Sequence, residues 1–391
     1  MTKTITIALL FIANFTFSQA TTITGVIKDI TTLLPVESVT IGVSNSNLGT
    51  ISNEEGKFQI TLLGTDTTIE FSHLYYKLAS YTVKQNETEI EIFLTPKIFI
   101  LDEVVINNKP GKELLSAAVT ASKEKLEKSI LLNTYYREFV NVDNKYTSFS
   151  DGLVDYYVKR KSGSSDLEVK QSRVFDLKDA NASERELAIQ SFNLNDIDDA
   201  VTDAYNFKGV SDLLRNDNYY YGVETKTADD GSSIKIITIE PKEGVEEGMI
   251  YEGSVTYDAK TNLILDINLR FSPAYKKFNR LHNILIAKIK FNDFARRSKF
   301  KLEGDKYVII YNQIKINIYI KFGKLINNTF ESVYDMTTLN YIEGEFKLDK
   351  TKKYKKKDLF ANGNKYTEEF WKTKNIMLLS EEEEKIISSL K

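Results

Sequence analysis

The stretch that decides the fold is QIKINIYIKF, residues 313–322, in which an apolar side chain occupies every second position from Ile314 to Phe322. Residues 262–271, NLILDINLRF, repeat this pattern. Successive side chains of a β-strand point to opposite faces, so a period of two is typical of a sheet with one covered face and one wet face. Both stretches therefore predict strands of an antiparallel sheet.

Around these two stretches, residues 130–350 are rich in further strand patterns. We expect strands near 134–142, 145–160, 166–175, 219–227, 233–240, 249–258, 284–291, 306–312, 325–335 and 340–348, with helical interruptions at 183–192 and 211–215. So many consecutive hairpins predict one extended, curved antiparallel sheet or an open half-barrel. A helix is expected over 112–129, because one stripe of it is apolar and the opposite side is charged, which is typical of a helix that packs on a sheet. The apolar stripe consists of Leu114, Leu115, Ala118, Val119 and Leu126.

Residues 21–106 form a different unit, in which short alternating strands are separated by frequent turn residues. This arrangement predicts a β-sandwich. The segments GVIKD (25–29), LPVESVTI (34–41), GTISNEEGKFQI (49–60), TIEFSHLYY (68–76) and LDEVVI (101–106) resemble the carboxypeptidase regulatory-like domain. The sequence departs from that family at Leu74 and Tyr75, where the family usually has a glycine before an aromatic residue. The resemblance implies a transthyretin-like seven-stranded sandwich, of a kind common in exported and outer-membrane proteins of Bacteroidetes-type bacteria.

A second resemblance lies in the large strand-rich region. Residues 253–264, GSVTYDAKTNLI, are similar to a hairpin of the lipoprotein-carrier (LolA/LolB-like) half-barrels, and Asp258 is suited to cap the turn. This resemblance implies a half-barrel fold with an apolar ligand groove. The expected fold class is therefore mainly β: a seven-stranded sandwich followed by a larger curved antiparallel sheet with a few covering helices.

The N-terminus has the composition of a secretory signal peptide. Lys3 is followed by an apolar run from Ile5 to Phe17 and by small residues up to Ala20. The run is short for a membrane span, and a first core strand or an uncleaved anchor is the alternative. We expect a signal peptide at 1–20, the sandwich at 21–106, a linker and helix at 107–129, and the large β domain with a C-terminal helix at 130–391.

The composition excludes several classes of partner and active site. The 52 basic and 55 acidic residues leave a net charge of −3, which argues against a nucleic-acid partner. The chain has no cysteine, which excludes disulfides, thiol catalysis and thiolate zinc sites. Its two histidines, His73 and His282, have no carboxylate next to them in the sequence, so neither predicts a zinc peptidase site. We therefore expect no catalytic residue, no cofactor and no metal.

One acidic group leaves an alternative open. Asp196, Asp198, Asp199 and Asp203 have oxygen ligands of the type that calcium prefers, but the group lacks the glycine and distal glutamate of an EF-hand loop. A solvated loop or a helix start is the interpretation that we favour.

These patterns predict an exported, non-catalytic binding or accessory protein, periplasmic or associated with the outer membrane, with a lipid or another envelope protein as partner and no transmembrane span after signal cleavage. We expect an apolar or extended ligand between the concave face of the large sheet and the 112–129 helix. The alternatives are that these residues form a closed core, that the chain is a structural partner of an outer-membrane complex, or that it is a hydrolase. The candidate ligand-binding residues are Leu263, Leu265, Ile267, Leu269, Ile314, Ile316, Ile318 and Ile320.

Overall fold

The computed structural model describes residues 20–62, 68–101, 110–126, 129–159, 163–176, 196–284, 287–324, 326–367 and 376–390. The predicted signal peptide up to residue 19, most of the linker that follows the sandwich, and the predicted helix at 183–192 lie outside these residues.

The first unit is a seven-stranded sandwich, as the sequence predicts. Its strands are β1 (Thr21–Asp29), β2 (Thr40–Val43), β3 (Gly49–Ile51), β4 (Lys57–Leu62), β5 (Thr68–His73), β6 (Tyr76–Thr82) and β7 (Glu89–Leu94). They form two sheets, in the orders β4-β1-β7 and β3-β2-β5-β6. Phe58 and Phe71 meet edge to face between the sheets, with ring centroids 5.5 Å apart. Gly56 has φ +70°, and a Cβ there would lie 2.4 Å from the Ile27 carbonyl oxygen, so the turn before β4 requires glycine.

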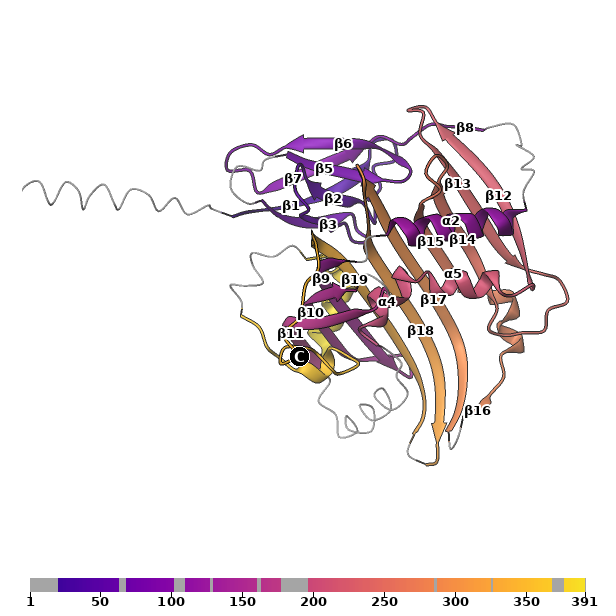
Figure 1. The fold of residues 1–391 in the computed structure, drawn as a ribbon. Helices are drawn as coiled ribbons and strands as arrows, with labels where there is room; N and C mark the ends of the chain where they lie inside the picture. The colour runs from indigo at the N-terminus through magenta and orange to yellow at the C-terminus, as the bar shows by residue number, and fades with distance from the viewer. Residues whose placement is uncertain are drawn as a thin grey trace, which may run out of the picture.

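The second unit is a curved antiparallel sheet of twelve strands, in the order β11-β10-β9-β19-β18-β17-β15-β14-β13-β12-β8, with β16 paired to β17 (Figure 1). The strands are β8 (Phe99–Leu101), β9 (Ile130–Val142), β10 (Lys145–Val158), β11 (Ser165–Asp176), β12 (Tyr219–Ala228), β13 (Ser233–Pro241), β14 (Tyr251–Asp258), β15 (Ile264–Phe271), β16 (His282–Ile284), β17 (Ala287–Glu303), β18 (Lys306–Phe322) and β19 (Ile326–Glu343). The predicted fold class is confirmed.

Three long strands differ from the predicted ones because β-bulges interrupt the alternation. In β18 the register with β17 shifts at Ile310, so the predicted strands 306–312 and 313–322 are one continuous strand. A shift at Leu339 likewise lies within β19, where two strands were expected. A shift at Asn292 falls inside β17, which continues to Glu303, well beyond the expected strand.

Three helices lie across one face of the large sheet: α2 (Gly111–Lys125), α4 (Asp199–Tyr205) and α5 (Lys208–Leu214) (Figure 1). Two short 3₁₀ turns, η1 (Pro273–Phe278) and η2 (Phe360–Asn362), lie in connections. The curvature makes the helix-covered face the concave one. Helix α2 ends at Lys125, four residues before the predicted end, because Leu126 is extended and leads the chain toward β9.

The opposite, convex face carries the sandwich and the C-terminal segment. Ile51 of the sandwich packs with Tyr135, Tyr311 and Met377, so all three parts meet in one apolar cluster. Helix α7 (Glu381–Ser389) is the predicted C-terminal helix, and it begins with a capping box formed by Ser380 and Glu383. Glu383 also accepts a hydrogen bond from the buried Arg137, at 2.8 Å.

Arg137 completes this junction with a second carboxylate. Its Nε lies 2.9 Å from both oxygens of Asp335, on the neighbouring strand β19. Both side chains are nearly fully buried, so the charges neutralise each other within the packed junction.

Candidate functional site

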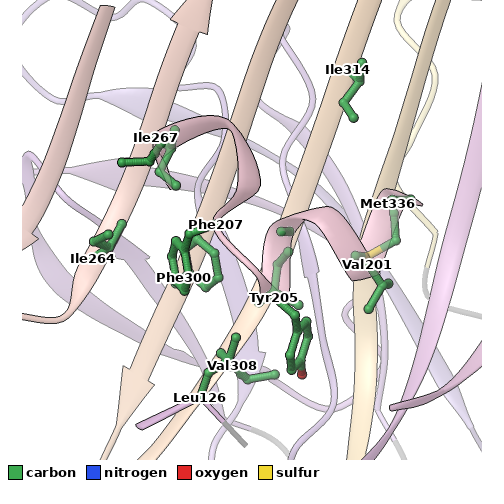
Figure 2. Close-up of a cluster of buried hydrophobic side chains, with 14 of the residues drawn as sticks. Leu126, Val201, Tyr205, Phe207, Ile264, Ile267, Phe300, Val308, Ile314 and Met336 are labelled. Carbon is green, nitrogen blue, oxygen red and sulfur yellow. The ribbon is translucent and has the colours of Figure 1, made fainter. Parts of the chain in front are cut away.

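The upper half of the concave face is filled by helix side chains (Figure 2). Val201 and Tyr205 of α4 pack onto the sheet, and the Phe207 ring stacks on Phe300 of β17 with centroids 5.1 Å apart. Leu115 and Ala118 of α2 are fully buried in the same cluster. Helix α2 therefore lies in direct contact with the sheet, and side chains occupy the space in which the sequence placed a ligand.

The four candidates of the β15 region divide between the two faces. Leu263, Ile267 and Leu269 are buried in the packed core beneath the helices. Leu265 is the extra residue of a bulge between β14 and β15, because Thr256 pairs with Asp266 while Tyr257 pairs with Ile264. The bulge turns Leu265 to the convex face, where it lines a cleft below the sandwich. The predicted single face through Leu263, Leu265 and Ile267 is therefore wrong at Leu265.

The four candidates of β18 follow the concave face downward. Ile314 belongs to the core under the helices. Ile318 and Ile320 belong to a separate apolar cluster with Val140 of β9 and Phe330 of β19. Ile316 is partly buried and lies between the two clusters. We call the second cluster the lower apolar cluster; its members are Val140, Val142, Ala287, Ile289, Ile318, Ile320, Ile326 and Phe330.

A row of polar side chains crosses the concave face between the two clusters. Arg296 of β17 pairs in register with Ile314, Ile314 with Tyr334 of β19, and Tyr334 with Glu138 of β9. Residues that face each other across paired strands point to the same side of a sheet, so the row shares the concave face. Ser332, two residues before Tyr334 on β19, points to this face as well. Arg296, Tyr334, Glu138 and Ser332 form what we call the polar band.

The charges of the polar band are partly matched by α4. Arg296 donates to Asp203 at 2.8 Å, and Asp203 also lies 3.6 Å from the Lys208 ammonium. Burial raises the pKa of Asp199, with a further contribution from the nearby Asp203 charge, to about 6. Burial also raises the pKa of the Tyr334 phenol well above its usual range, so this hydroxyl stays protonated.

Three polar atoms at or beside the band are buried and have no hydrogen-bond partner among the described residues. They are the Tyr136 hydroxyl, the Ser332 hydroxyl and the Arg296 Nε. An unsatisfied buried polar atom costs about 1–3 kcal/mol, and native structures contain few of them. The Tyr136 hydroxyl lies in the core under the helices, whereas Ser332 pairs with Ile316 between the two clusters, where a polar group of a ligand, or water, would be stabilised.

The predicted acidic group does not converge on a common point. Asp196 pairs with Lys357, Asp198 accepts a hydrogen bond from the Ser165 hydroxyl, and Asp203 pairs with Arg296. Asp199 is the first residue of α4. The carboxylates therefore begin a helix and bind cationic or hydroxyl partners on different elements.

The two histidines lie in different parts of the molecule, and His282 pairs in register with Ile289 of the lower apolar cluster. His73 ends β5 of the sandwich, and His282 begins the short edge strand β16, where it is exposed. Burial lowers the pKa of His73 to about 3, and the positive charges of Lys299 and Arg297 contribute. The imidazole of His73 is therefore neutral at physiological pH.

Comparisons with known proteins bear on the two units separately. Residues 23–106 match the CarboxypepD_reg-like domain. This match confirms the resemblance of the sandwich, and of the large sheet it includes only the outer strand β8. No curated protein matches the sequence.

Solved structures resemble the larger part of the chain at low identity. A structure titled for lipid–protein interactions in lipovitellin matches with 10% identity and a TM-score of 0.24, covering 59% of this chain and 27% of that chain. A DUF1329 family protein from Desulfovibrio piger matches with 12% identity and a TM-score of 0.28, covering 62% and 96%. A LolA superfamily protein from Nitrosomonas europaea matches with 8% identity and a TM-score of 0.21, covering 62% and 97%. Matches this distant carry no functional argument.

Among the described residues, no helix combines the length and the apolar character needed to cross a bilayer.

Proposed function

We propose that this chain is an exported, non-catalytic binding or accessory protein of a bacterial envelope, periplasmic or associated with the outer membrane, and that its large sheet holds an apolar or extended ligand. The observation that carries the proposal is a pair of buried, unpartnered polar atoms between the closed core and the lower apolar cluster: the Ser332 hydroxyl and the Arg296 Nε. The signal-peptide composition and the CarboxypepD_reg-like domain support export.

The arrangement suits a ligand with an apolar body and a polar end. The body would lie against the partly buried margin of the lower apolar cluster, at Ile316, Phe291 and Phe322, where each buried methylene contributes about 0.8 kcal/mol. The polar end would lie at the band, where Ser332 offers a hydroxyl group and Arg296 offers an N–H donor. A lipid has this combination of groups.

The helices explain why the ligand belongs in the lower half of the sheet. Helices α4 and α5 cover β17, β18 and β19 only over part of their length, and these strands continue well beyond the helices (Figure 1). Above this level, the core under α2, α4 and α5 is closed by packed side chains.

The test uses N-phenyl-1-naphthylamine, a small apolar dye whose fluorescence rises when it leaves water. We expect the mature chain to bind it, and we expect Ile316→Lys to weaken the binding by about tenfold or more, because an ammonium group would stand beside the apolar cluster. Ile100→Lys is the matched control, since Ile100 lies on the outer strand β8 and is exposed. Equal dye binding by both variants, with unchanged circular dichroism, would remove the support for a site on the concave face.

A second candidate function, as a structural partner of an outer-membrane complex, is favoured by one observation. Strand β8 is an edge strand of the large sheet. Ile100 within it is 59% exposed, and Ile98 directly before it is 67% exposed. An apolar outer strand is suited to pair with another chain. Native extraction from the envelope distinguishes the two functions. A protein that co-purifies in stoichiometric amounts, and is lost with Ile100→Lys, supports the role as a structural partner. A lipid that co-purifies, and is lost with Ile316→Lys, supports ligand binding.

A further inference from the structure

A cleft of about 290 Å³ lies between the sandwich and the convex face of the large sheet. Its roof comes from β2 and β5 of the sandwich, and its floor from β15 and β17. The lining residues that bear on its chemistry are Ser38, Thr40, Ser72, His73, Lys299 and Lys301. A pocket of this volume is at the small end of the range for ligand sites.

The cleft is rich in hydrogen-bond donors. Lys299 forms its floor beside Asp266, at 3.1 Å, and Lys301 lies 2.8 Å from Glu303. Lys97 lies at the wall, where its Nζ donates to the Ser232 hydroxyl at 2.9 Å. Lysine ammonium groups together with hydroxyl groups are a common donor set for phosphate oxygens.

The two carboxylates of the lining are already engaged. Asp266 is paired with Lys299. Asp258 caps its own turn, accepting from the Thr261 N–H and the Thr261 hydroxyl, both at 2.7 Å. Lys97 lies 3.3 Å from Asp230 and Lys301 lies 2.8 Å from Glu303, and both acidic partners are partly exposed. Such exposed pairs contribute only about 0–1 kcal/mol, so a ligand anion can compete for the two ammonium groups.

His73 contributes a neutral hydrogen-bond donor to the cleft. Its Nδ1 accepts from the Tyr75 N–H at 3.3 Å, which places the proton of the neutral ring on Nε2 as a donor. The lowered pKa of His73 reflects burial and the nearby charges of Lys299 and Arg297. Burial is the larger cause and penalises a charge of either sign, so only the smaller contribution of the two cations favours an anion.

We infer that this cleft between the sandwich and the sheet binds a phosphate-bearing ligand, held by Lys299, Lys301 and the hydroxyl groups of Ser72 and Thr40. The volume admits the phosphate and a few further atoms. The phosphate belongs either to a free phosphate ester or to a lipid headgroup. This site lies on the opposite face of the sheet from the polar band, so it is independent of the proposed function.

The test exploits the presence of only two histidines in the chain. Inorganic phosphate is titrated into the full mature chain at constant ionic strength, and the two imidazole signals are followed by NMR. We expect the His73 signal to move and saturate and the His282 signal to stay, since His282 is exposed on β16. Movement of both signals alike, or the same movement with sodium chloride, overturns the inference.

Two lysine variants complete the test. Lys301→Gln should weaken phosphate binding about tenfold, because one cationic contact is lost. Lys306→Gln is the matched control: Lys306 is also partly exposed and paired with a glutamate, Glu343, but it does not line the cleft. Equal effects of both variants overturn the inference.

A parallel titration with dihexanoyl-phosphatidylglycerol, a short-chain soluble lipid, distinguishes a free phosphate ester from a lipid headgroup. A His73 response to inorganic phosphate supports a free phosphate ester, and a response to the lipid alone supports a headgroup. If the His73 signal moves in neither titration, the inference is overturned.

Discussion

At the scale of single residues, Ser122 explains how a strand with a bulge is kept in the core. Ile264 pairs with Tyr257 at the end of β15, directly before the bulge at Leu265. The Ile264 N–H donates to the Ser122 hydroxyl of α2, at 2.9 Å, and the Tyr307 hydroxyl donates to the Ile264 carbonyl. Ser122 is fully buried, so this contact joins α2 to the sheet without water.

Ser122→Ala should destabilise the protein by about 1–3 kcal/mol, because it leaves the buried Ile264 N–H without an acceptor. The measurement is the urea unfolding midpoint. Ser116→Ala, on the exposed side of the same helix, serves as the control and should change stability by less than about 0.5 kcal/mol. Equal effects of the two substitutions would show that the hydroxyl does not act as this acceptor.

The alternation of apolar and polar residues predicts the face of most side chains in β15 and β18, but not of all. It placed Ile314, Ile318 and Ile320 correctly on a buried face. The alternation could not place Leu265, because the extra residue of a bulge leaves the face that the alternation assigns to it, and a run of aliphatic residues gives no sign of the bulge.

At the scale of elements, α4 brings a charge close to the concave face. Its first residue, Asp199, has its pKa raised to about 6 by burial and by Asp203. An unfolded aspartate has a pKa near 3.9, so between about pH 4 and pH 6 the folded chain binds the extra proton. Stability therefore falls as the pH rises through this window.

Asp199→Asn should remove this dependence. We expect little change near pH 4 and a gain on the order of 1 kcal/mol at pH 7, a figure reduced for the partial exposure of the carboxyl group. Urea unfolding at pH 4, 5 and 7 measures it, with Asp212→Asn on α5 as the control, since Asp212 lies in an exposed pair with Arg215. The same gain at every pH would contradict the assignment to Asp199 titration.

In the whole molecule, the sandwich is attached to the large sheet by ion pairs and by one apolar cluster. Ion pairs bridge the two units, among them Arg297 with Glu37 at 3.0 Å and Lys77 with Asp229 at 2.6 Å. Both pairs are partly exposed, and such pairs contribute about 0–1 kcal/mol each. Burial of Ile51 against Tyr135 and Met377 contributes about 1.5–3 kcal/mol, so the apolar contact is the stronger one.

Ile51→Asp should therefore separate the two units. Sodium chloride at 1 M should not separate them, although it lowers the Debye length to about 3 Å and so weakens the ion pairs. Small-angle X-ray scattering measures the expected rise in radius of gyration, and Ile51→Ala should produce a smaller one. Expansion of the unchanged protein in 1 M salt would show that the ion pairs hold the units together.

The mainly β fold class, the seven-stranded sandwich, the apolar stripe of α2 and the C-terminal helix could be predicted from the sequence, because each depends on residues close together in the chain. Long-range contacts place the helices on the upper concave face, and strand register puts Arg296, Tyr334 and Glu138 in one row although β9 and β17 are far apart in sequence. That row depends on strand register, which bulges and long-range pairing set together, and no local pattern encodes either of them.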